Sequence, residues 1–225
     1  MALILNIDTA TEIASISISE KGNVLDSVIS SNQKNHAAFL QPSIKYLLQK
    51  INLPISKLNA VAVTSGPGSY TGLRVGMASA KGLCYALNIP MITINTLEVM
   101  ALSTILQIQD KQALYCPMID ARRMEVFTAI YDYHLGEKLK PCAMILDAES
   151  FKNLLLTNKI YFSGSGMAKI TGMIENKNAM FTAKEIIYTA MAELSYKNYL
   201  NKIFADIFYT SPVYLKEFYT PSKHQ

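Results

Sequence analysis

The sequence predicts an α/β protein made of two lobes, each a mixed β-sheet flanked by helices. Apolar segments with strand and helix periodicity follow one another in the order β-β-β-α-β-α, and the same order restarts half-way along the chain. Asp8 and Asp120 each end the opening strand of one half of the 225 residues. We therefore expect an N-terminal lobe at 1–109 and a C-terminal lobe at 110–225.

The first half opens with three short strands. Residues 3–7 form a continuous apolar run typical of a buried strand. Residues 14–19 alternate apolar side chains with Ser15, Ser17 and Ser19, which predicts a half-buried antiparallel strand with the serines on the open face. A third strand is expected at 24–29. The later elements of this half are a helix at 40–51, a strand at 60–63, a helix ending near 87, a strand at 91–94 and a helix at 97–107.

The second half repeats this pattern with weaker signals. Glycine-rich or polar turns separate apolar segments of strand length, and a long periodic stretch closes the chain. The expected elements are strands at 115–119 and 125–131, a third strand after a turn at 134–137, a helical region at 149–156, a strand at 159–162 and a helix from 183 to about 202.

Composition excludes several classes of protein. Half of the residues are hydrophobic and 17% are charged, which is typical of a globular chain and not of a disordered one. The net charge of +4 comes without a basic run, so a nucleic-acid partner is permitted but not indicated. No apolar stretch reaches the length of a membrane helix, and Asn6 and Asp8 break up the apolar start, which argues against a signal peptide. Three widely spaced cysteines fit a reduced, cytoplasmic compartment.

A strand that ends in an acid and runs into a tight hairpin occurs once in each half. This arrangement resembles the actin, hexokinase and Hsp70 superfamily, whose RNase H-like lobes offer such hairpins to nucleotide phosphates. Glycine is usual there because backbone N–H groups reach phosphate oxygens only where no side chain intervenes. The hairpins after Asp8-Thr9 and Asp120-Ala121-Arg122 contain none. We expect no efficient ATP hydrolysis, and two interpretations of the acids remain: local caps, or a residual ligand role.

Two glycine-containing turns are further candidates for an anion or nucleotide site. Gly66, Gly68, Ser69 and Arg74 belong to the run GPGSYTGLR between a buried strand and a helix, where backbone N–H groups and the arginine suit an anion. The alternative is that Ser69 caps the helix while the glycines form the turn. Gly164 and Gly166 follow a later strand, either as adenosine-contacting glycines or as a plain turn.

The helix after the glycine-rich run has an unusual face of small residues. Leu73, Met77, Ala80, Cys84 and Leu87 predict the core-facing side, whereas Gly72, Gly76, Ser79, Gly82 and Ala86 cluster on another side. Each glycine inside a helix costs roughly 1 kcal/mol relative to alanine, so close packing is expected there. The neighbour is either the 40–51 helix of the same lobe or a helix of another chain.

Catalytic signatures are missing from the sequence. The histidines, His36, His134 and His224, have no histidine or cysteine at metal-ligand spacing, and no GxSxG run occurs. We therefore predict no catalytic residue and no metal site.

Four blocks of residues resemble the bacterial TsaB family, formerly YeaZ. Their order and spacing cover nearly the whole chain, with Lys216 where arginine is usual. The blocks are Ile7–Ala10, Gly66–Gly76 with Ala80–Leu83, Asp120–Phe127 and Pro212–Lys216.

The resemblance implies a role in forming N6-threonylcarbamoyladenosine in tRNAs that read ANN codons. In that family the chain is a non-catalytic subunit that binds TsaD, the metal-binding catalytic paralogue, while the ATPase TsaE belongs to the same complex. It also implies self-association through the same helices, no cofactor of the chain's own, ATP or ADP at most at the partner interface, and tRNA as the substrate of the complex.

We assign the partner surface, as a hypothesis, to two neighbouring helices. Its residues are Leu40, Tyr46, Gly72, Gly76, Ser79 and Gly82. Two other functions stay open: a sugar or acyl kinase of the same superfamily, and a peptidase with Ser65 or Ser69 as nucleophile.

Overall fold

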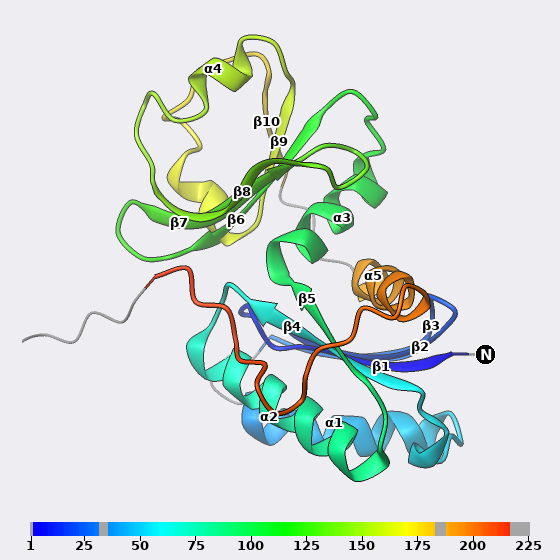
Figure 1. Ribbon diagram of the computed structural model, residues 1–225. Coiled ribbons are helices and arrows are strands. Elements are labelled where there is room, and N and C mark those ends of the chain that lie inside the picture. Colours follow the sequence, from blue (N-terminus) through cyan, green and yellow to red (C-terminus); the bar gives the residue numbers. More distant parts are fainter. Residues whose placement is uncertain (1, 32–35, 183–187, 217–225) are drawn as a thin grey trace, which may run out of the picture.

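Two five-stranded sheets stand one above the other, with helices around and between them (Figure 1). The computed structural model describes residues 2–31, 36–182 and 188–216. None of the helices in these ranges is long and apolar enough to cross a membrane.

The first sheet has the order β3-β2-β1-β4-β5. β1 pairs antiparallel with β2 and parallel with β4, so the sheet is mixed as predicted. α1 and α2 pack on one of its faces (Figure 1). The elements are β1 Leu3–Asp8, β2 Ala14–Glu20, β3 Asn23–Ser30, α1 His36–Lys50, η2 Ile55–Lys57, β4 Ala60–Gly66, α2 Tyr70–Leu87, β5 Met91–Asn95 and α3 Thr96–Ile108.

The second sheet has the equivalent order, β8-β7-β6-β9-β10, and the same mixture of parallel and antiparallel pairs. This confirms the prediction of two similar mixed-sheet lobes. The four-residue β10 was not predicted, and the helical region at 149–156 is reduced to the single turn α4. The elements are β6 Leu114–Asp120, β7 Glu125–Tyr131, β8 Glu137–Ile145, α4 Lys152–Leu155, β9 Ile160–Ser163, η3 Ser165–Lys169, β10 Ala179–Thr182 and α5 Tyr188–Leu200.

α5 returns to the first sheet, which corrects the assignment of all of 110–225 to one lobe. It packs on β1, β2, β3 and β5, opposite α1 and α2 (Figure 1). The segment that follows α5 stays with the first lobe as well, since Ala205 N donates to Met91 O at 2.8 Å. α5 and the start of the segment after it therefore pack on the N-terminal lobe. The part of the predicted helix at 183–187 lies outside the described residues.

α5 also corrects the prediction for the serine face of β2. Ser17 and Ser19 are buried instead of open to solvent, because α5 covers this side of the sheet. Buried hydroxyls need partners. Asn6 Nδ2 donates to Ser19 Oγ at 3.0 Å, so a polar contact lies beneath the helix.

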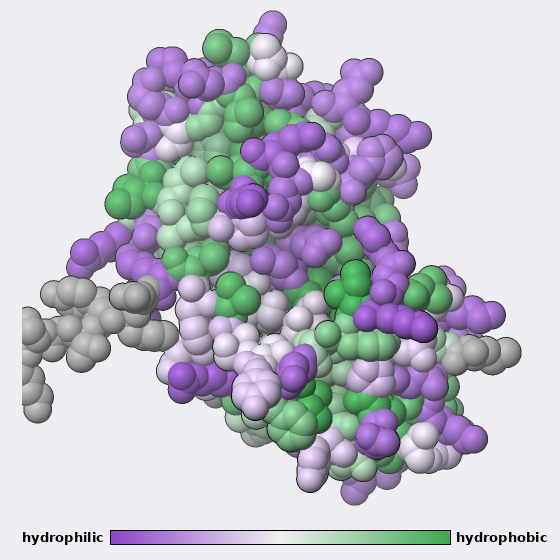
Figure 2. Space-filling view, in the orientation of Figure 1, coloured by the Kyte–Doolittle hydropathy of each residue, from purple (hydrophilic) through white to green (hydrophobic). Residues whose placement is uncertain are grey.

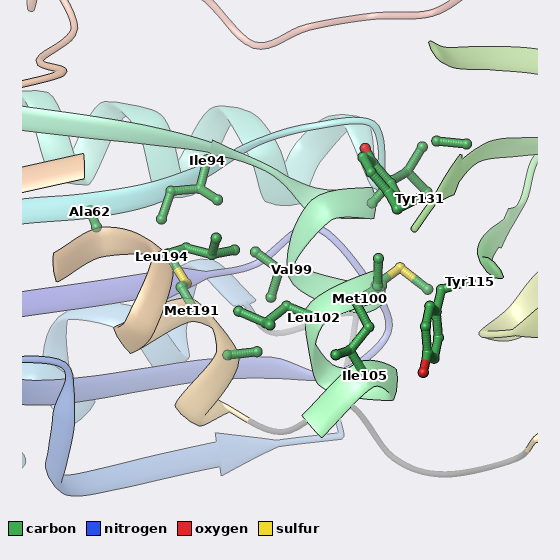
Figure 3. Close-up of a cluster of buried hydrophobic side chains, with 14 of the residues drawn as sticks. Ala62, Ile94, Val99, Met100, Leu102, Ile105, Tyr115, Tyr131, Met191 and Leu194 are labelled. Atoms are coloured by element: carbon green, nitrogen blue, oxygen red, sulfur yellow. The ribbon is translucent and has the colours of Figure 1, made fainter. Parts of the chain in front are cut away.

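A continuous apolar core joins the two sheets through α3. Val99 and Leu102 point toward Met191 and Leu194 of α5, whereas Met100 and Ile105 of α3 lie toward Tyr115 of β6 (Figure 3). Helix α3 is hydrophobic on nearly every side, which is typical of a helix buried between other elements. The orientation of the lobes thus rests on a shared core and not only on a linker.

We expect Leu194→Ala to lower the free energy of unfolding by about 2–4 kcal/mol, because a buried leucine is lost from the α3–α5 contact. Leu200→Ala, at an exposed position of the same helix, should change it by less than about 0.5 kcal/mol. Urea unfolding at equilibrium measures both. Equal effects would show that α5 does not complete the core.

Candidate functional site

The first hairpin is held by its own side chains. Asp8 Oδ1 accepts hydrogen bonds from Ala10 N at 3.1 Å and from Thr64 Oγ1 at 3.0 Å. Thr9 is buried, and its hydroxyl donates to Gly72 O in the first turn of α2 at 2.7 Å. The Asp8 carboxylate therefore serves as a local cap that also ties β1 to β4.

The glycine-rich loop packs directly on that hairpin. Ser69 N donates to Ala10 O at 2.6 Å, and a Cβ at Gly68 would lie 2.2 Å from the same oxygen. Ser69 also caps α2, accepting from Gly72 N at 3.3 Å. The capping interpretation describes this loop, and Gly68 is required by the close approach of the two backbones.

The loop's other side is covered by the chain's C-terminal segment. Val213 N donates to Ser65 O at 2.7 Å, and a Cβ at Gly66, where φ is +116°, would lie 2.5 Å from Val213 O. Arg74 stacks on Tyr70, with its guanidinium 4.1 Å from the ring centroid, and donates to Tyr214 Oη at 3.1 Å. Tyr214 stood in one of the family-like blocks, but its contact with α2 was not predicted, because 140 positions separate Arg74 and Tyr214.

The second hairpin carries an ion pair instead of a glycine turn. Lys169 Nζ donates to Asp120 Oδ1 at 2.6 Å and to Glu125 O at 2.8 Å. The Lys169 ammonium and the N–H of Arg122 hold the pKa of Asp120 below its usual range. Arg122 and Arg123 both have left-handed φ values, +70° and +48°, which are uncommon for residues with side chains. Asp120 is thus engaged by its own lobe.

The turn after β9 is shaped by packing. A Cβ at Gly164, where φ is +90°, would lie 2.4 Å from both Met118 O and Met100 Cε. A Cβ at Gly166 would lie 2.7 Å from Val126 Cγ1. Both glycines are explained by the close approach of η3 and α3 to β6 and β7, as in the plain-turn interpretation.

The hydroxyls proposed as peptidase nucleophiles have other partners. Ser65 Oγ donates to Ile94 O at 3.2 Å, and Ser69 Oγ caps α2.

Burial raises the pKa of the Cys84 thiol to about 11. Within 2–31, 36–182 and 188–216, no group of three metal-ligating side chains converges. His224 and the side chain of His36 lie outside the described part of the chain.

The predicted partner surface needs correction at three positions. Leu40 is fully buried in the core under α1. Gly72 and Gly76 lie on the buried side of α2, and a Cβ at Gly76 would be 2.4 Å from Thr9 Oγ1. The small size of Gly76 is therefore required by β1 and its hairpin, so these three residues are not available to another chain.

The other three residues lie at the surface on neighbouring helices. Tyr46 is exposed on α1, and a Cβ at Gly82 on α2 would meet no atom within 4 Å. Ser79 is half-buried, and its Oγ accepts from Gln41 Nε2 of α1 at 3.2 Å. α1 and α2 also border a groove of about 660 Å³, which was not predicted. Its apolar lining comes from Ile44, Leu48, Leu53, Pro54, Ile55 and Leu83.

Comparisons with known proteins agree with this architecture. Residues 23–200 match the family model described as TsaD: tRNA N6-adenosine threonylcarbamoyltransferase. The chain is 31% identical over 176 residues to the tRNA threonylcarbamoyladenosine biosynthesis protein TsaB of Bacillus subtilis, covering 77% of this chain and 75% of the relative. The chain belongs to the TsaB branch of this family. The Haemophilus influenzae TsaB protein is 26% identical over 95% of this chain and 93% of its own length.

A solved TsaB-type structure has the same fold. YeaZ from Pseudomonas aeruginosa superposes with a TM-score of 0.80 at 22% identity, over 96% of this chain and all of the other. The superfamily fold predicted from the hairpins and the family predicted from the sequence blocks are thereby confirmed.

The two α2 glycines give a matched pair of variants. We expect Gly76→Ala to lower the free energy of unfolding by about 1–3 kcal/mol, because the new methyl group collides with Thr9. Gly82→Ala should raise it by about 0.5–1 kcal/mol, since an open helix position gains propensity. Urea unfolding distinguishes them, and a Gly76→Ala variant of unchanged stability would contradict the close packing of Gly76 on Thr9.

The Asp120–Lys169 pair predicts a dependence on pH. The Lys169 side chain is 13% exposed and that of Asp120 47% exposed, so solvent screens the pair in part. We expect Asp120→Asn to lower the unfolding free energy at pH 7 by about 1 kcal/mol. Because folding lowers this pKa, the loss should be full above the ordinary value of 3.8 and vanish as pH falls through the lowered pKa.

Urea titrations from pH 2.5 to 7 measure this loss. Glu149→Gln removes the more exposed pair with Lys152 and serves as the control, with no measurable change expected. A loss that stays constant over the whole pH range would mean that Asp120 contributes by packing and not by charge.

Proposed function

We propose that this chain serves tRNA threonylcarbamoyladenosine biosynthesis as a subunit without catalytic chemistry of its own. The names of the relatives support the pathway. The glycine-rich loop is the observation that supports a subunit without catalysis. Its backbone is covered on one side by Ala10 and on the other by Val213. The backbone groups of this loop that would have to face a phosphate are therefore engaged by other parts of the chain. We propose no cofactor site in this chain.

The partner proposed is a TsaD-type catalytic subunit, and the contact surface is the exposed side of α1 and α2. Tyr46, Ser79 and Gly82 lie at the surface of these helices, and Leu83 of α2 helps to line the apolar groove. Small side chains on α2 would let a partner helix approach closely, as the sequence suggested, but at Ser79, Gly82 and Ala86 and not at the buried Gly72 and Gly76. The same face would account for self-association.

The remaining components follow from the same proposal. A TsaE-type ATPase would join the complex, tRNA would be its substrate, and any ATP or ADP would lie at the partner interface. The metal would belong to the TsaD-type partner. The setting would be the cytoplasm, where the thiols of Cys84 and Cys116 remain reduced.

The kinase and peptidase alternatives have weaker support. A kinase needs a phosphate-binding hairpin, but the carboxylate of Asp8 is bonded to Thr64 and Ala10. A peptidase needs a base beside its nucleophile, but Ser65 donates to a backbone carbonyl.

An omission experiment tests the proposal. Threonylcarbamoylation of a tRNA transcript is reconstituted from the purified components, with and without this chain, and modified adenosine is measured by mass spectrometry. We expect modification to require the chain, while the chain alone neither modifies tRNA nor hydrolyses ATP. Full modification without the chain would overturn the assignment, and ATP turnover by the chain alone would favour a kinase.

The contact surface is tested with bulky variants in the same system. Ser79→Trp and Gly82→Trp should weaken binding of the TsaD-type partner by about tenfold or more, because the indole holds the two surfaces apart. Glu193→Trp places the same bulk at an exposed position of α5, across the sheet, and should leave the affinity unchanged. Calorimetric titration measures the affinities, and circular dichroism confirms that each variant is folded. Unchanged affinity in both α2 variants would exclude this surface.

A further inference from the structure

One side of α2 carries two basic residues flanked by two aromatic ones, and the proposed function leaves all four unused. Tyr70, Arg74, Lys81 and Tyr85 follow one another at spacings of four, seven and four, which aligns them along the helix. The C-terminal segment runs beside them in the opposite direction. Tyr214 contacts Tyr70 and Arg74 near the start of α2, and Phe208 contacts Tyr85 near its end.

These contacts leave large aromatic surfaces in solvent. Tyr85 is 71%, Phe208 70% and Tyr209 88% exposed. Lys81 lies among them, and its ammonium donates to Phe208 O at 3.4 Å. The face over α2 and the C-terminal segment shows pale and green atoms interrupted by separate purple groups (Figure 2). A gathering of exposed rings of this kind marks an interaction surface.

Further cations extend this surface toward the second lobe. Lys216 pairs with Glu125 at 2.5 Å, which brings the C-terminal segment to the β6–β7 hairpin. Arg122 and Arg123 are exposed on that hairpin in the left-handed conformation. Glycine or asparagine would adopt this backbone conformation at lower cost. The presence of two arginines there points to a use for their side chains.

The acids along this path have partners within the chain. Glu125 pairs with Lys216, Asp120 pairs with Lys169, and Asp206 accepts from the N–H groups of Phe208 and Tyr209. The surface is therefore electropositive and aromatic at once. Interleaved cations and rings suit a strand of nucleotides, whereas the centre of a protein interface is poor in charge.

We propose that single-stranded or loop RNA binds along this surface, from the Arg122–Arg123 hairpin to Tyr85. Phosphates would lie near Arg74, Lys81 and the hairpin arginines, and bases would stack on Tyr85, Phe208 and Tyr209. From Tyr70 to Tyr85 the helix measures about 22 Å, enough for several stacked nucleotides. The inference rests on the proposed function, because the substrate of that pathway is a tRNA.

The test is fluorescence anisotropy with a labelled, unmodified tRNA transcript and the full chain, at salt concentrations from 50 to 200 mM. Tyr85→Ala with Phe208→Ala should weaken binding by about fivefold or more for each stack lost. Arg122→Gln with Arg123→Gln should weaken it and make the dependence of log affinity on log salt shallower by about 1–2.

A control pair removes the same kinds of side chain elsewhere. Leu156→Ala with Lys152→Gln deletes an exposed apolar group and a cation near α4, at the far end of the second lobe, and should leave the affinity unchanged. If both test pairs stay within twofold of the unsubstituted chain, or if the control falls as far as they do, the RNA surface is refuted.

The outcome is separable from that of the omission experiment. If modification requires the chain while the test pairs keep their RNA affinity, the proposed function stands and this inference fails. The RNA inference also fails if the test pairs lose only the affinity for the TsaD-type partner, because the surface then belongs to a protein interface. Loss of RNA affinity with partner affinity unchanged supports the inference.

Discussion

The burial of α3 between the two sheets is the contact on which the arrangement of the molecule depends. Val99 and Leu102 of this helix pack against α5, and Met100 and Ile105 pack toward β6. Because α3 has apolar side chains on almost every side, it is stable only when both lobes cover it. The lobes are therefore held at a fixed orientation, and α5 must return from the end of the chain to close the core.

A second constraint is the close packing of the first hairpin, the glycine-rich loop and α2. Thr9 binds Gly72 O, Ala10 O lies against Gly68, and Gly76 leaves room for the Thr9 side chain. In the superfamily that this fold resembles, such hairpins face phosphates. Here the backbone groups of the loop are paired within the chain, which is the observation that supports the proposed subunit without catalytic chemistry. The exposed side of α2 and its neighbour α1 form the proposed partner surface.

The C-terminal segment connects these two parts of the molecule. It pairs with β5 through Ala205, follows α2 through Phe208 and Tyr214, covers the glycine-rich loop at Val213 and reaches the second lobe at Lys216. One extended stretch thus supports the loop, borders the proposed RNA surface and bridges the lobes. The proposed protein contact and the proposed RNA contact would lie on different sides of the same helix.

The order of the elements and the two-lobed sheet architecture could be predicted from the sequence, because the periodicity of apolar residues is a local property. The sequence also led to the family, since the glycine-rich block and the Asp120 block are contiguous motifs. Local patterns also predicted the helix cap at Ser69 and the core-facing residues Leu73, Met77 and Ala80.

Which side of a helix is exposed could be read only from the folded chain. Helical spacing placed Gly76 and Gly82 on one face, but Thr9 fills the space at Gly76 and nothing lies near Gly82. The serines of β2 looked solvent-exposed until α5, about 170 residues later, covered them. The exposed aromatic and basic residues of α2 form the proposed RNA surface only together with Phe208 and Tyr214 of the C-terminal segment. Each of these outcomes depends on contacts between residues distant in the chain, which a local pattern does not contain.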